Sequence, residues 1–294
     1  MHIVVHGSLE KRRRYPQGRA VANDGAWEET MNGTPRGQSD GPATAPQLTV
    51  KDAVGTIRLN RPLQHNRIDV ADIAILEERI AAAEANPSVR VLVLTATGPS
   101  FSSGYDLSTA QSSQRGGADG QDGENAFARL CDRVEAVRVP TICALNGSVY
   151  GGSTDLALAC DFRIGVTGMR MRMPAGQLGI QFYPGGLRRY VSRLGLNAAK
   201  RLFLTAETIA DHEMLNIGFL DRVVDPDDLP AAVDELAGRI TACAPQAIAG
   251  MKRALNDIAR GEMDDRAAEA AFTASLRSDE FANALKVWSQ RRAS

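Results

Sequence analysis

The sequence predicts an α/β protein, because short apolar segments of strand character alternate with amphipathic helical segments. Residues 89–95 and 139–145 are runs of apolar and β-branched residues, typical of strands buried on both faces of a sheet. From Ile73 to Ala83, apolar residues recur at three- and four-residue spacing, as on one face of a helix. The length of 294 residues allows one large domain or two modest ones.

Composition excludes several classes of function. A hydrophobic fraction of 44% and a charged fraction of 23% are those of an ordinary soluble protein. The net charge of −1 offers no bulk attraction to nucleic acid or an anionic membrane, and no apolar run is long enough to span a bilayer. The four cysteines are scattered without a C-x-x-C pair, which predicts reduced, mostly buried thiols in a cytoplasmic protein. No pair of histidines lies at metal-ligand spacing in a segment expected to be ordered, so no metal site is expected.

Residues 1–45 differ in composition from the rest. They are rich in glycine, contain the basic run at 11–14 and show no apolar period, which predicts a disordered leader. Acidic residues at 10, 24, 28 and 29 weaken an interpretation as a targeting peptide. The alternative is that translation starts at Met31, which peptides from before Met31 would exclude.

From residue 48 the expected elements follow in order. Two strands at 48–50 and 54–59 precede a helix capped by Asp69 and stopped at Asn86–Pro87. The Gly-rich stretch 108–123 is expected to be a flexible loop, either a cover for an acyl chain or a tolerated insertion, before a helix at 124–137. The later expectations are strands at 162–165, 169–173 and 220–224, helices at 187–196, 198–204 and 209–218, and a helical region from 229 broken at Pro245 and Gly261.

The stretch NGSVYGGSTDLALACD at 146–161 organises the chain. Gly147, Gly151 and Gly152 lie between a buried strand and a helix, where the backbone can adopt φ > 0 and approach a ligand closely. A helix N-terminus at this point directs N–H groups and a positive dipole at a phosphate or a developing oxyanion. A purely structural glycine turn is the alternative.

A second motif, FSSGYDL at 101–107, precedes it. Together the two motifs resemble those of the enoyl-CoA hydratase/isomerase (crotonase) superfamily, and the resemblance runs from about residue 48 to the C-terminus. Further matches are the segments 59–62, 178–179, 184–186 and 204–206, and Asn66. The resemblance implies a spiral of repeated ββα units at 46–228, followed at 229–294 by helices that pack between subunits and close over coenzyme A in a homotrimer or homohexamer.

By the same resemblance, the N–H groups of Tyr105 and Gly152 stabilise the enolate of an acyl-CoA thioester. Hydratases of the family use two glutamates, and here those positions hold Asp155 and Ala175. Because alanine cannot transfer a proton, isomerase, decarboxylase or thioester hydrolase chemistry is favoured over plain hydration. Asp155 is a base or merely a helix-start residue. Tyr183 is a hydrogen-bond donor or a wall of the acyl pocket.

Coenzyme A is expected as part of the substrate, with no permanently bound cofactor. The residues that the resemblance places around it are Asn60, Arg61, Ser103, Asp106, Leu107, Trp288 and Arg291. For Arg291, a solvated basic tail is the alternative. A catalytically silent acyl-CoA binder is the rival function, whereas RNA binding lacks a concentrated basic stripe.

Overall fold

The computed structural model describes residues 45–107 and 119–293. The predicted leader, apart from its last residue, and most of the predicted loop at 108–123 lie outside the described residues. Within the described residues, no helix combines the length and apolar character that crossing a membrane requires.

Six strands form the larger sheet, in the order β1-β2-β3-β5-β7-β10. Their bounds are β1 Gln47–Lys51, β2 Val54–Leu59, β3 Val91–Ala96, β5 Thr141–Leu145, β7 Phe162–Val166 and β10 Arg222–Val224. β1 and β2 form an antiparallel pair, and each later neighbour pairs in parallel. Every residue of β3 and β5 is buried, because helices cover both faces of a parallel sheet. The apolar runs at 89–95 and 139–145 therefore predicted these strands correctly.

Four short strands form a second sheet, in the order β4-β6-β8-β9. They are β4 Ser100–Ser102, β6 Ser148–Tyr150, β8 Arg170–Arg172 and β9 Thr208–Ala210. After β3, β5 and β7 the chain passes from the larger sheet into the smaller one, and a helix follows each such strand pair. This repetition is the series of ββα units that the resemblance implied.

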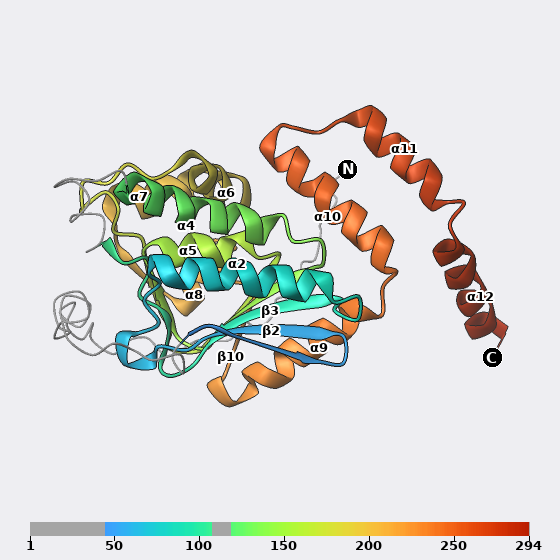
Figure 1. The fold of residues 1–294 in the computed structure, drawn as a ribbon, viewed down its shortest axis with the longest axis horizontal. Helices are drawn as coiled ribbons and strands as arrows, with labels where there is room; N and C mark the ends of the chain where they lie inside the picture. The colour runs from blue at the N-terminus through green and yellow to red at the C-terminus, as the bar shows by residue number, and fades with distance from the viewer. Residues whose placement is uncertain (1–44, 108–118, 294) are drawn as a thin grey trace, which may run out of the picture. The chain divides into compact units, whose positions relative to one another are not determined.

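Helices follow and enclose the sheets (Figure 1). They are α2 Val70–Ala85, α4 Asp119–Glu135, α5 Gly152–Ala159, α6 Pro184–Leu194, α7 Leu196–Thr205, α8 Asp211–Asn216, α9 Leu229–Thr241, α10 Pro245–Arg260, α11 Asp265–Ser275 and α12 Asp279–Ala293, with short 3-10 turns at Pro62–Gln64 and Pro226–Asp228. The predicted cap of α2 is confirmed, because the Asp69 carboxylate accepts the N–H of Asp72 and the Asp72 carboxylate accepts the N–H of Asp69. In Figure 1, α2 and α9 lie on opposite sides of the larger sheet.

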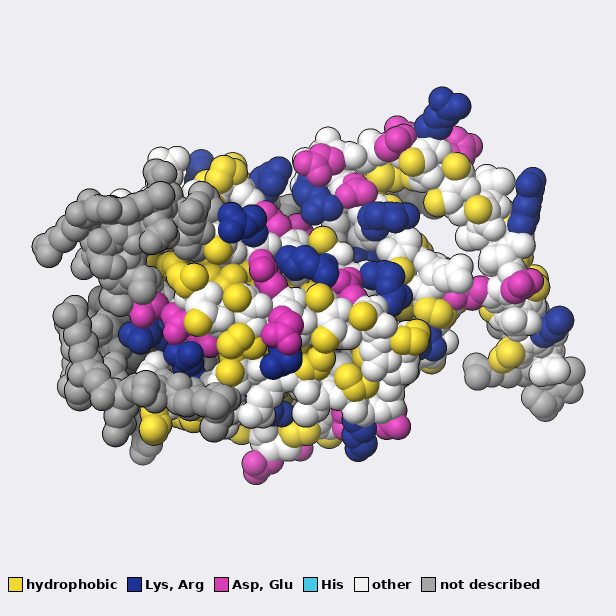
Figure 2. Space-filling view, viewed as in Figure 1, with side chains coloured by type: hydrophobic (Ala, Val, Ile, Leu, Met, Phe, Trp, Pro, Cys, Tyr) yellow, Lys and Arg dark blue, Asp and Glu magenta, His cyan; other side chains and the backbone are white. Residues whose placement is uncertain are grey.

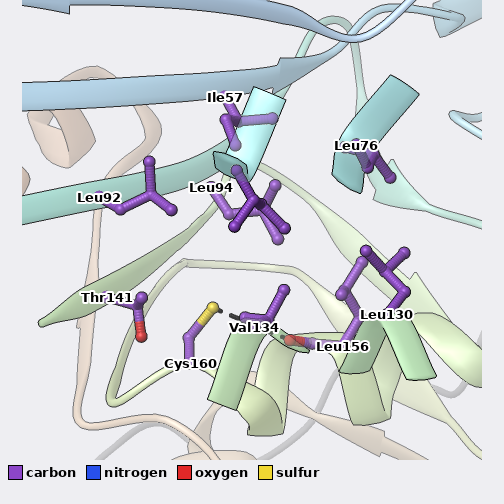
Figure 3. Close-up of a pocket in the computed structure, with 10 residues that line it drawn as sticks. Ile57, Leu76, Leu92, Leu94, Leu130, Val134, Thr141, Leu156 and Cys160 are labelled. Atoms are coloured by element: carbon purple, nitrogen blue, oxygen red, sulfur yellow. Dashed lines mark hydrogen bonds between the residues drawn. The ribbon is translucent and has the colours of Figure 1, made fainter. Parts of the chain in front are cut away.

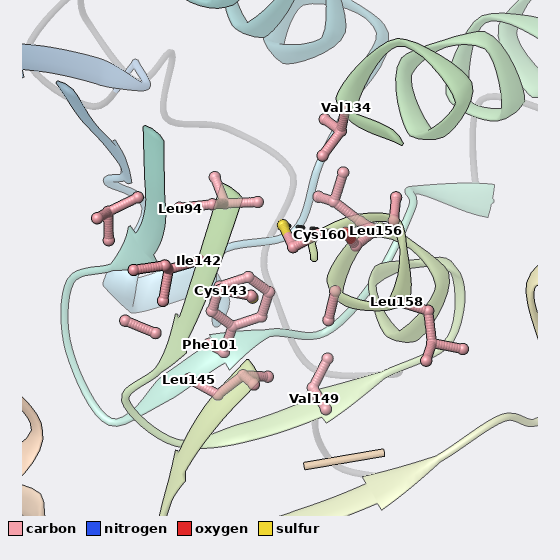
Figure 4. Packing of buried hydrophobic residues seen from close by; sticks show 14 of the residues in the cluster. Leu94, Phe101, Val134, Ile142, Cys143, Leu145, Val149, Leu156, Leu158 and Cys160 are labelled. Carbon is pink, nitrogen blue, oxygen red and sulfur yellow. Dashed lines mark hydrogen bonds between the residues drawn. The ribbon is translucent and has the colours of Figure 1, made fainter. Parts of the chain in front are cut away.

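The core fills the space between the sheets and α5. Phe101 from β4, Ile142 and Cys143 from β5, and Leu156 and Leu158 from α5 are almost completely buried and lie close together (Figure 4). Burying each large apolar side chain contributes roughly 1.5–3 kcal/mol. The core therefore holds both the strand that leads into the glycine turn and the helix that follows it.

The C-terminal region is helical, as predicted. Pro245 begins α10, and Gly261 ends it in the left-handed conformation with φ 72°. The Lys252 ammonium anchors α10 to the core by donating to the Val139 carbonyl at 3.0 Å and pairing with Asp161 at 2.7 Å. The first helix of the region, α9, packs against β3, β5 and β7, so it covers the larger sheet as well.

Two predicted elements are wrong in detail. α4 begins at Asp119, inside the stretch predicted to be a loop. Thr208–Ala210 is strand β9 rather than the start of a helix, because it pairs antiparallel with β8 at the edge of the smaller sheet. Long-range strand pairing outweighs local helix preference at that position.

Acidic and basic side chains are interspersed over the helices on the face shown in Figure 2. Three of the four cysteines (Cys131, Cys143 and Cys160) are buried free thiols, and Cys243 is exposed. The expectation of mostly buried cysteines is confirmed, and their reduced state stays a prediction.

Candidate active site

Two glycine turns leave neighbouring strands of the smaller sheet at the same edge. β4 ends at Ser102 and is followed by Gly104, while β6 ends at Tyr150 and is followed by Gly151 and α5. Because β4 and β6 are parallel neighbours, the two turns emerge side by side. The FSSGYDL motif therefore lies next to the start of the helix that carries Asp155.

The turns approach so closely that Gly104 has to be glycine. Its φ is 106°, and a Cβ atom built on it would lie 2.9 Å from the Tyr150 carbonyl oxygen and 3.4 Å from the Gly152 nitrogen. Any side chain there would meet the backbone of the second turn. The absence of a Cβ is what lets the backbones of Gly104 and Gly152 meet.

In each turn, one peptide group has its carbonyl oxygen hydrogen-bonded within the protein. The N–H of that peptide group faces the opposite direction. The Gly104 carbonyl accepts from the Ile68 N–H at 2.9 Å, and the Gly151 carbonyl accepts from the Thr154 N–H at 3.1 Å and its hydroxyl at 2.6 Å. In a trans peptide the N–H points opposite to the C=O, and the described residues contain no cis peptide bond. The Tyr105 N–H therefore points away from Ile68, and the Gly152 N–H points out of the N-terminus of α5.

Asp155 lies in the first turn of α5 and its side chain is completely buried. The Arg189 guanidinium binds it through two contacts, from Nε to Oδ1 at 3.0 Å and from Nη2 to Oδ2 at 2.7 Å. The Tyr183 hydroxyl donates to the same Oδ2 at 2.6 Å. Both carboxylate oxygens of the predicted base are thus bonded within the protein.

Arg189 belongs to a larger ionic network beneath the site. Its Nη1 contacts Asp132 at 2.6 Å and Glu135 at 3.5 Å, and Glu135 also pairs with Arg193 at 3.1 Å and Arg260 at 3.3 Å. Burial alone would lower the pKa of the Arg189 guanidinium, but the bonds to Asp155 and its charge raise it above the usual value. Arg189 is therefore a permanent cation that neutralises Asp155.

Tyr183 precedes α6, and its side chain bridges two helices. Its hydroxyl contacts the Cys131 thiol at 3.4 Å as well as Asp155. Burial, followed by the neighbouring Cys131 and Asp155, raises the pKa of the Tyr183 hydroxyl well above its usual value. Tyr183 is thus a neutral donor whose proton is directed at Asp155, and its role toward a substrate stays a prediction.

Ala175 is buried just after β8, and its carbonyl accepts from the Ile180 N–H at 2.9 Å. The segment from Pro174 to Ile180 is closed by further backbone hydrogen bonds from Gln177 and Leu178 to the Pro174 carbonyl. This position therefore supplies no proton-transfer group.

The residues predicted to contact coenzyme A occupy several places. Arg61 pairs with Asp69 at 2.8 Å and Asp72 at 3.2 Å. Asp106 is buried and pairs with Arg67 at 3.2 Å. The remaining positions are Asn60 after β2, Ser103 in the first turn, Leu107 at the edge of the described residues, and Trp288 and Arg291 in α12, whose side chains are not among those described. For all seven residues, contact with coenzyme A stays a prediction.

Asp72 gives this region a dependence on pH. Burial raises the pKa of the Asp72 carboxyl from its ordinary 3.8 to about 6, while the hydrogen bond from the Asp69 N–H opposes the rise and the charge of Asp69 adds to it. The folded chain therefore holds a proton on Asp72 more tightly than the unfolded chain. The resulting stabilisation is complete below pH 3.8 and is lost as the pH rises through about 6.

We expect Asp72→Asn, which cannot ionise, to gain stability relative to the unaltered protein as the pH rises through this window. Urea unfolding at several pH values measures the effect. Asp227→Asn, at an exposed acid outside the site, is the control and should show no such gain. Parallel stability curves for Asp72→Asn and the unaltered protein would contradict the assignment.

A small cavity lies in the core, separate from the catalytic groups. Its volume is about 20 Å³, and Figure 3 shows Leu94, Leu130 and Leu156 among the side chains that line it. A space of this size and apolar character suits neither a polar water site nor an acyl chain. It belongs to the hydrophobic core.

Arg189 is a residue of the candidate site that sequence reasoning missed. Arg188 and Arg189 are indistinguishable by composition, yet Arg188 is half exposed and Arg189 is buried. The available signal was helical spacing, because Gly186, Arg189 and Tyr190 are the buried residues of α6. Nothing local pointed to Asp155 as its partner.

Comparison with known proteins agrees with this geometry. The family model for enoyl-CoA hydratase/isomerase matches residues 49–292. A crotonyl-CoA hydratase of Syntrophomonas wolfei is 31% identical over 220 residues, covering 74% of this chain and 83% of that protein. A short-chain-enoyl-CoA hydratase of Clostridium acetobutylicum is 32% identical over 212 residues, covering 71% of this chain and 80% of that protein.

A solved enoyl-CoA hydratase of Bacillus anthracis superposes with a TM-score of 0.76 at 24% identity, covering 84% of this chain and 96% of that one, which shows a shared fold. The predicted crotonase-like architecture is thereby confirmed. With a family match over most of its length, the chain belongs to the enoyl-CoA hydratase/isomerase family.

Proposed function

We propose that the protein acts on an acyl-CoA thioester by stabilising its enolate with the N–H groups of Tyr105 and Gly152. The observation that carries the proposal is the close approach of the two glycine turns, where a Cβ on Gly104 would lie 3.4 Å from the Gly152 nitrogen. Two backbone donors in a preorganised site stabilise a developing oxyanion without reorganisation. The start of α5 adds the positive end of a helix dipole.

We further propose that the reaction is not plain hydration. Hydration by a carboxylate pair needs two acid/base groups, whereas Ala175 has none and Asp155 is bonded to Arg189 and Tyr183. Isomerisation, decarboxylation or thioester hydrolysis does not require this pair of acid/base groups. Decarboxylation suits the site best, because the bond from the α-carbon to the carboxylate supplies the electron pair of the enolate, CO₂ departs, and no base is required. The α-carbon of the enolate then takes a proton from solvent water to give the saturated acyl-CoA.

The test is an assay with purified protein on a panel of thioesters. Crotonyl-CoA should keep its conjugated-thioester absorbance, while a malonyl-type CoA should lose CO₂ and give the saturated acyl-CoA, identified by mass. Loss of the crotonyl-CoA band with a β-hydroxyacyl product would contradict the proposal. It would instead assign to this chain the hydration named for its relatives.

A second candidate function is a catalytically silent acyl-CoA binder. The observation that favours it is the complete engagement of Asp155, whose two oxygens are both bonded within the protein. Solvent deuterium exchange at the α-carbon of a saturated acyl-CoA separates the two. Exchange that Asp155→Asn abolishes supports an enzyme with this base, whereas binding without turnover of any thioester on the panel supports the silent binder.

The finer features are proposed on the same footing. Coenzyme A would arrive with the substrate along Ser103, Asp106 and Leu107, and the protein would act in the cytoplasm in fatty acid metabolism. A homotrimer or homohexamer would form through the C-terminal helices, where exposed apolar side chains include Leu255, Ile258 and Phe272. Light scattering measures the oligomer size.

A further inference from the structure

A buried pair of hydroxyl groups joins the two glycine turns. Ser102 Oγ and Ser153 Oγ lie 2.7 Å apart, and both side chains are fully buried. Ser102 lies two residues before Gly104, and Ser153 directly follows Gly152. The hydroxyl pair therefore links one turn to the other through side chains alone.

Hydrogen-bond accounting fixes the direction of this link. Ser102 Oγ lies 2.7 Å from the Asn66 carbonyl, which only accepts, so the Ser102 proton goes there. The Gly104 N–H donates to Ser102 Oγ at 3.1 Å. A hydroxyl has one proton and two lone pairs, so Ser153 donates to the remaining lone pair. Ser102 Oγ is thus fully satisfied by Gly104 of its own turn and by Asn66 and Ser153 from two other segments of the chain.

The segment around Asn66, whose carbonyl accepts the Ser102 proton, is itself rigid. Asn66 is buried with φ 51°, and its side chain donates to the Thr97 and Ser100 carbonyls at 2.9 Å each and accepts from the Arg61 N–H at 2.8 Å. By contrast, the β4–β6 pairing shifts register between Ser100 and Ser102. The strand ladder is irregular just before the first turn, and there the bonds of Ser102 hold the backbone.

We propose that Ser102, held by Ser153, is a positioning residue that sets the separation of the Tyr105 and Gly152 N–H groups. This inference rests on the proposed function. Donors of an oxyanion hole act at 2.7–3.1 Å from the oxygen, and the two donors here belong to different strand–turn units. The hydrogen bond between the two hydroxyls connects those units directly. Ser153 lies one residue from Gly152, and Ser102 lies three residues from Tyr105.

A buried hydroxyl can also serve stability alone, and the chain offers a matched control. The Thr95 hydroxyl on β3 donates to the Ala144 carbonyl at 2.9 Å and is buried in the same core, but it joins β3 to β5 rather than the two turns. Thr95→Val removes a comparable bond. The readout has to report polarisation of the substrate carbonyl, because a purely structural bond leaves that unchanged.

The experiment uses para-dimethylaminocinnamoyl-CoA, a thioester whose absorption moves to longer wavelength when its carbonyl is polarised. Binding to the unaltered protein and to Thr95→Val should give the same shift. Ser102→Ala should lose most of the shift, and turnover of the substrate identified by the panel should fall about tenfold or more with little change in KM. Ser153→Ala keeps the bonds of Ser102 to Asn66 and Gly104, so it should fold and lose part of the shift.

Equal shifts for Ser102→Ala, Ser153→Ala and Thr95→Val would overturn the positioning role while leaving the oxyanion hole intact. If Ser102→Ala does not fold, Ser153→Ala alone decides between these outcomes. No shift in the unaltered protein, despite binding of the probe, would overturn both the proposed function and this inference.

Discussion

Replacing Arg189 with methionine is expected to lower the free energy of unfolding by about 3–5 kcal/mol, because removing one partner of a buried ion pair leaves the other charge uncompensated. Asp155 is completely buried, and Arg189 binds both of its oxygens. Urea-induced unfolding at neutral pH measures the loss. Arg188→Met is the matched control, since Arg188 is half exposed and its contact with Glu262 is long, at 4.0 Å.

A double variant tests the cause. Arg189→Met combined with Asp155→Leu removes both charges, so it should recover much of the stability that Arg189→Met loses. If Arg189→Met were no less stable than Arg188→Met, the pair of Arg189 and Asp155 would not contribute the expected stability. If the double variant lost as much stability as Arg189→Met and Asp155→Leu lose together when measured singly, lost packing rather than the unpaired charge would be responsible.

Gly104→Ala is expected to reduce turnover by roughly 10²–10³-fold, the loss typical of removing one oxyanion donor. At φ 106° an alanine is strained, and its Cβ would lie 2.9 Å from the Tyr150 oxygen, so the first turn has to move away from the second. Steady-state kinetics on the substrate identified by the panel measures the loss, and thermal unfolding confirms that the variant is folded.

Gly168→Ala separates backbone strain from separation of the turns. Gly168 also has a positive φ, of 82°, but a Cβ there would meet nothing within 4 Å. This control should lose stability to a similar degree while retaining activity. Equal activity of the two variants would show that the approach of Gly104 to Gly152 is not needed for the reaction.

Local sequence signals predicted much of the fold. Asp69 marked the start of α2, Asn86 its end, and Pro245 and Gly261 the limits of α10. Each of these depends on interactions within a few residues, which a pattern can express. The start of α4 and strand β9 were missed, the latter because it is specified by pairing with β8.

The candidate site was predictable only where it depends on the backbone. The glycine turn at 147–152 was identified because positive φ restricts the residue type, although of its three glycines only Gly151 adopts a positive φ. Gly104 was identified through the resemblance of the FSSGYDL motif. The partners of Asp155 were not, because Arg189 is 34 residues away and meets it only when α6 packs on α5. Ser102 and Ser153 were hidden for the same reason, since serine is common and the sequence does not show their contact.

The ionic network couples helix α10 energetically to the buried carboxylate of Asp155. Arg260 of α10 contacts Glu135, Glu135 contacts Arg189, and Arg189 binds Asp155. Coupling between sites is reciprocal: if displacement of α10 alters ligand affinity at Asp155, then ligand binding alters the docking of α10 by an equal free energy. Subunit assembly through α10 and binding of the thioester would then be thermodynamically coupled.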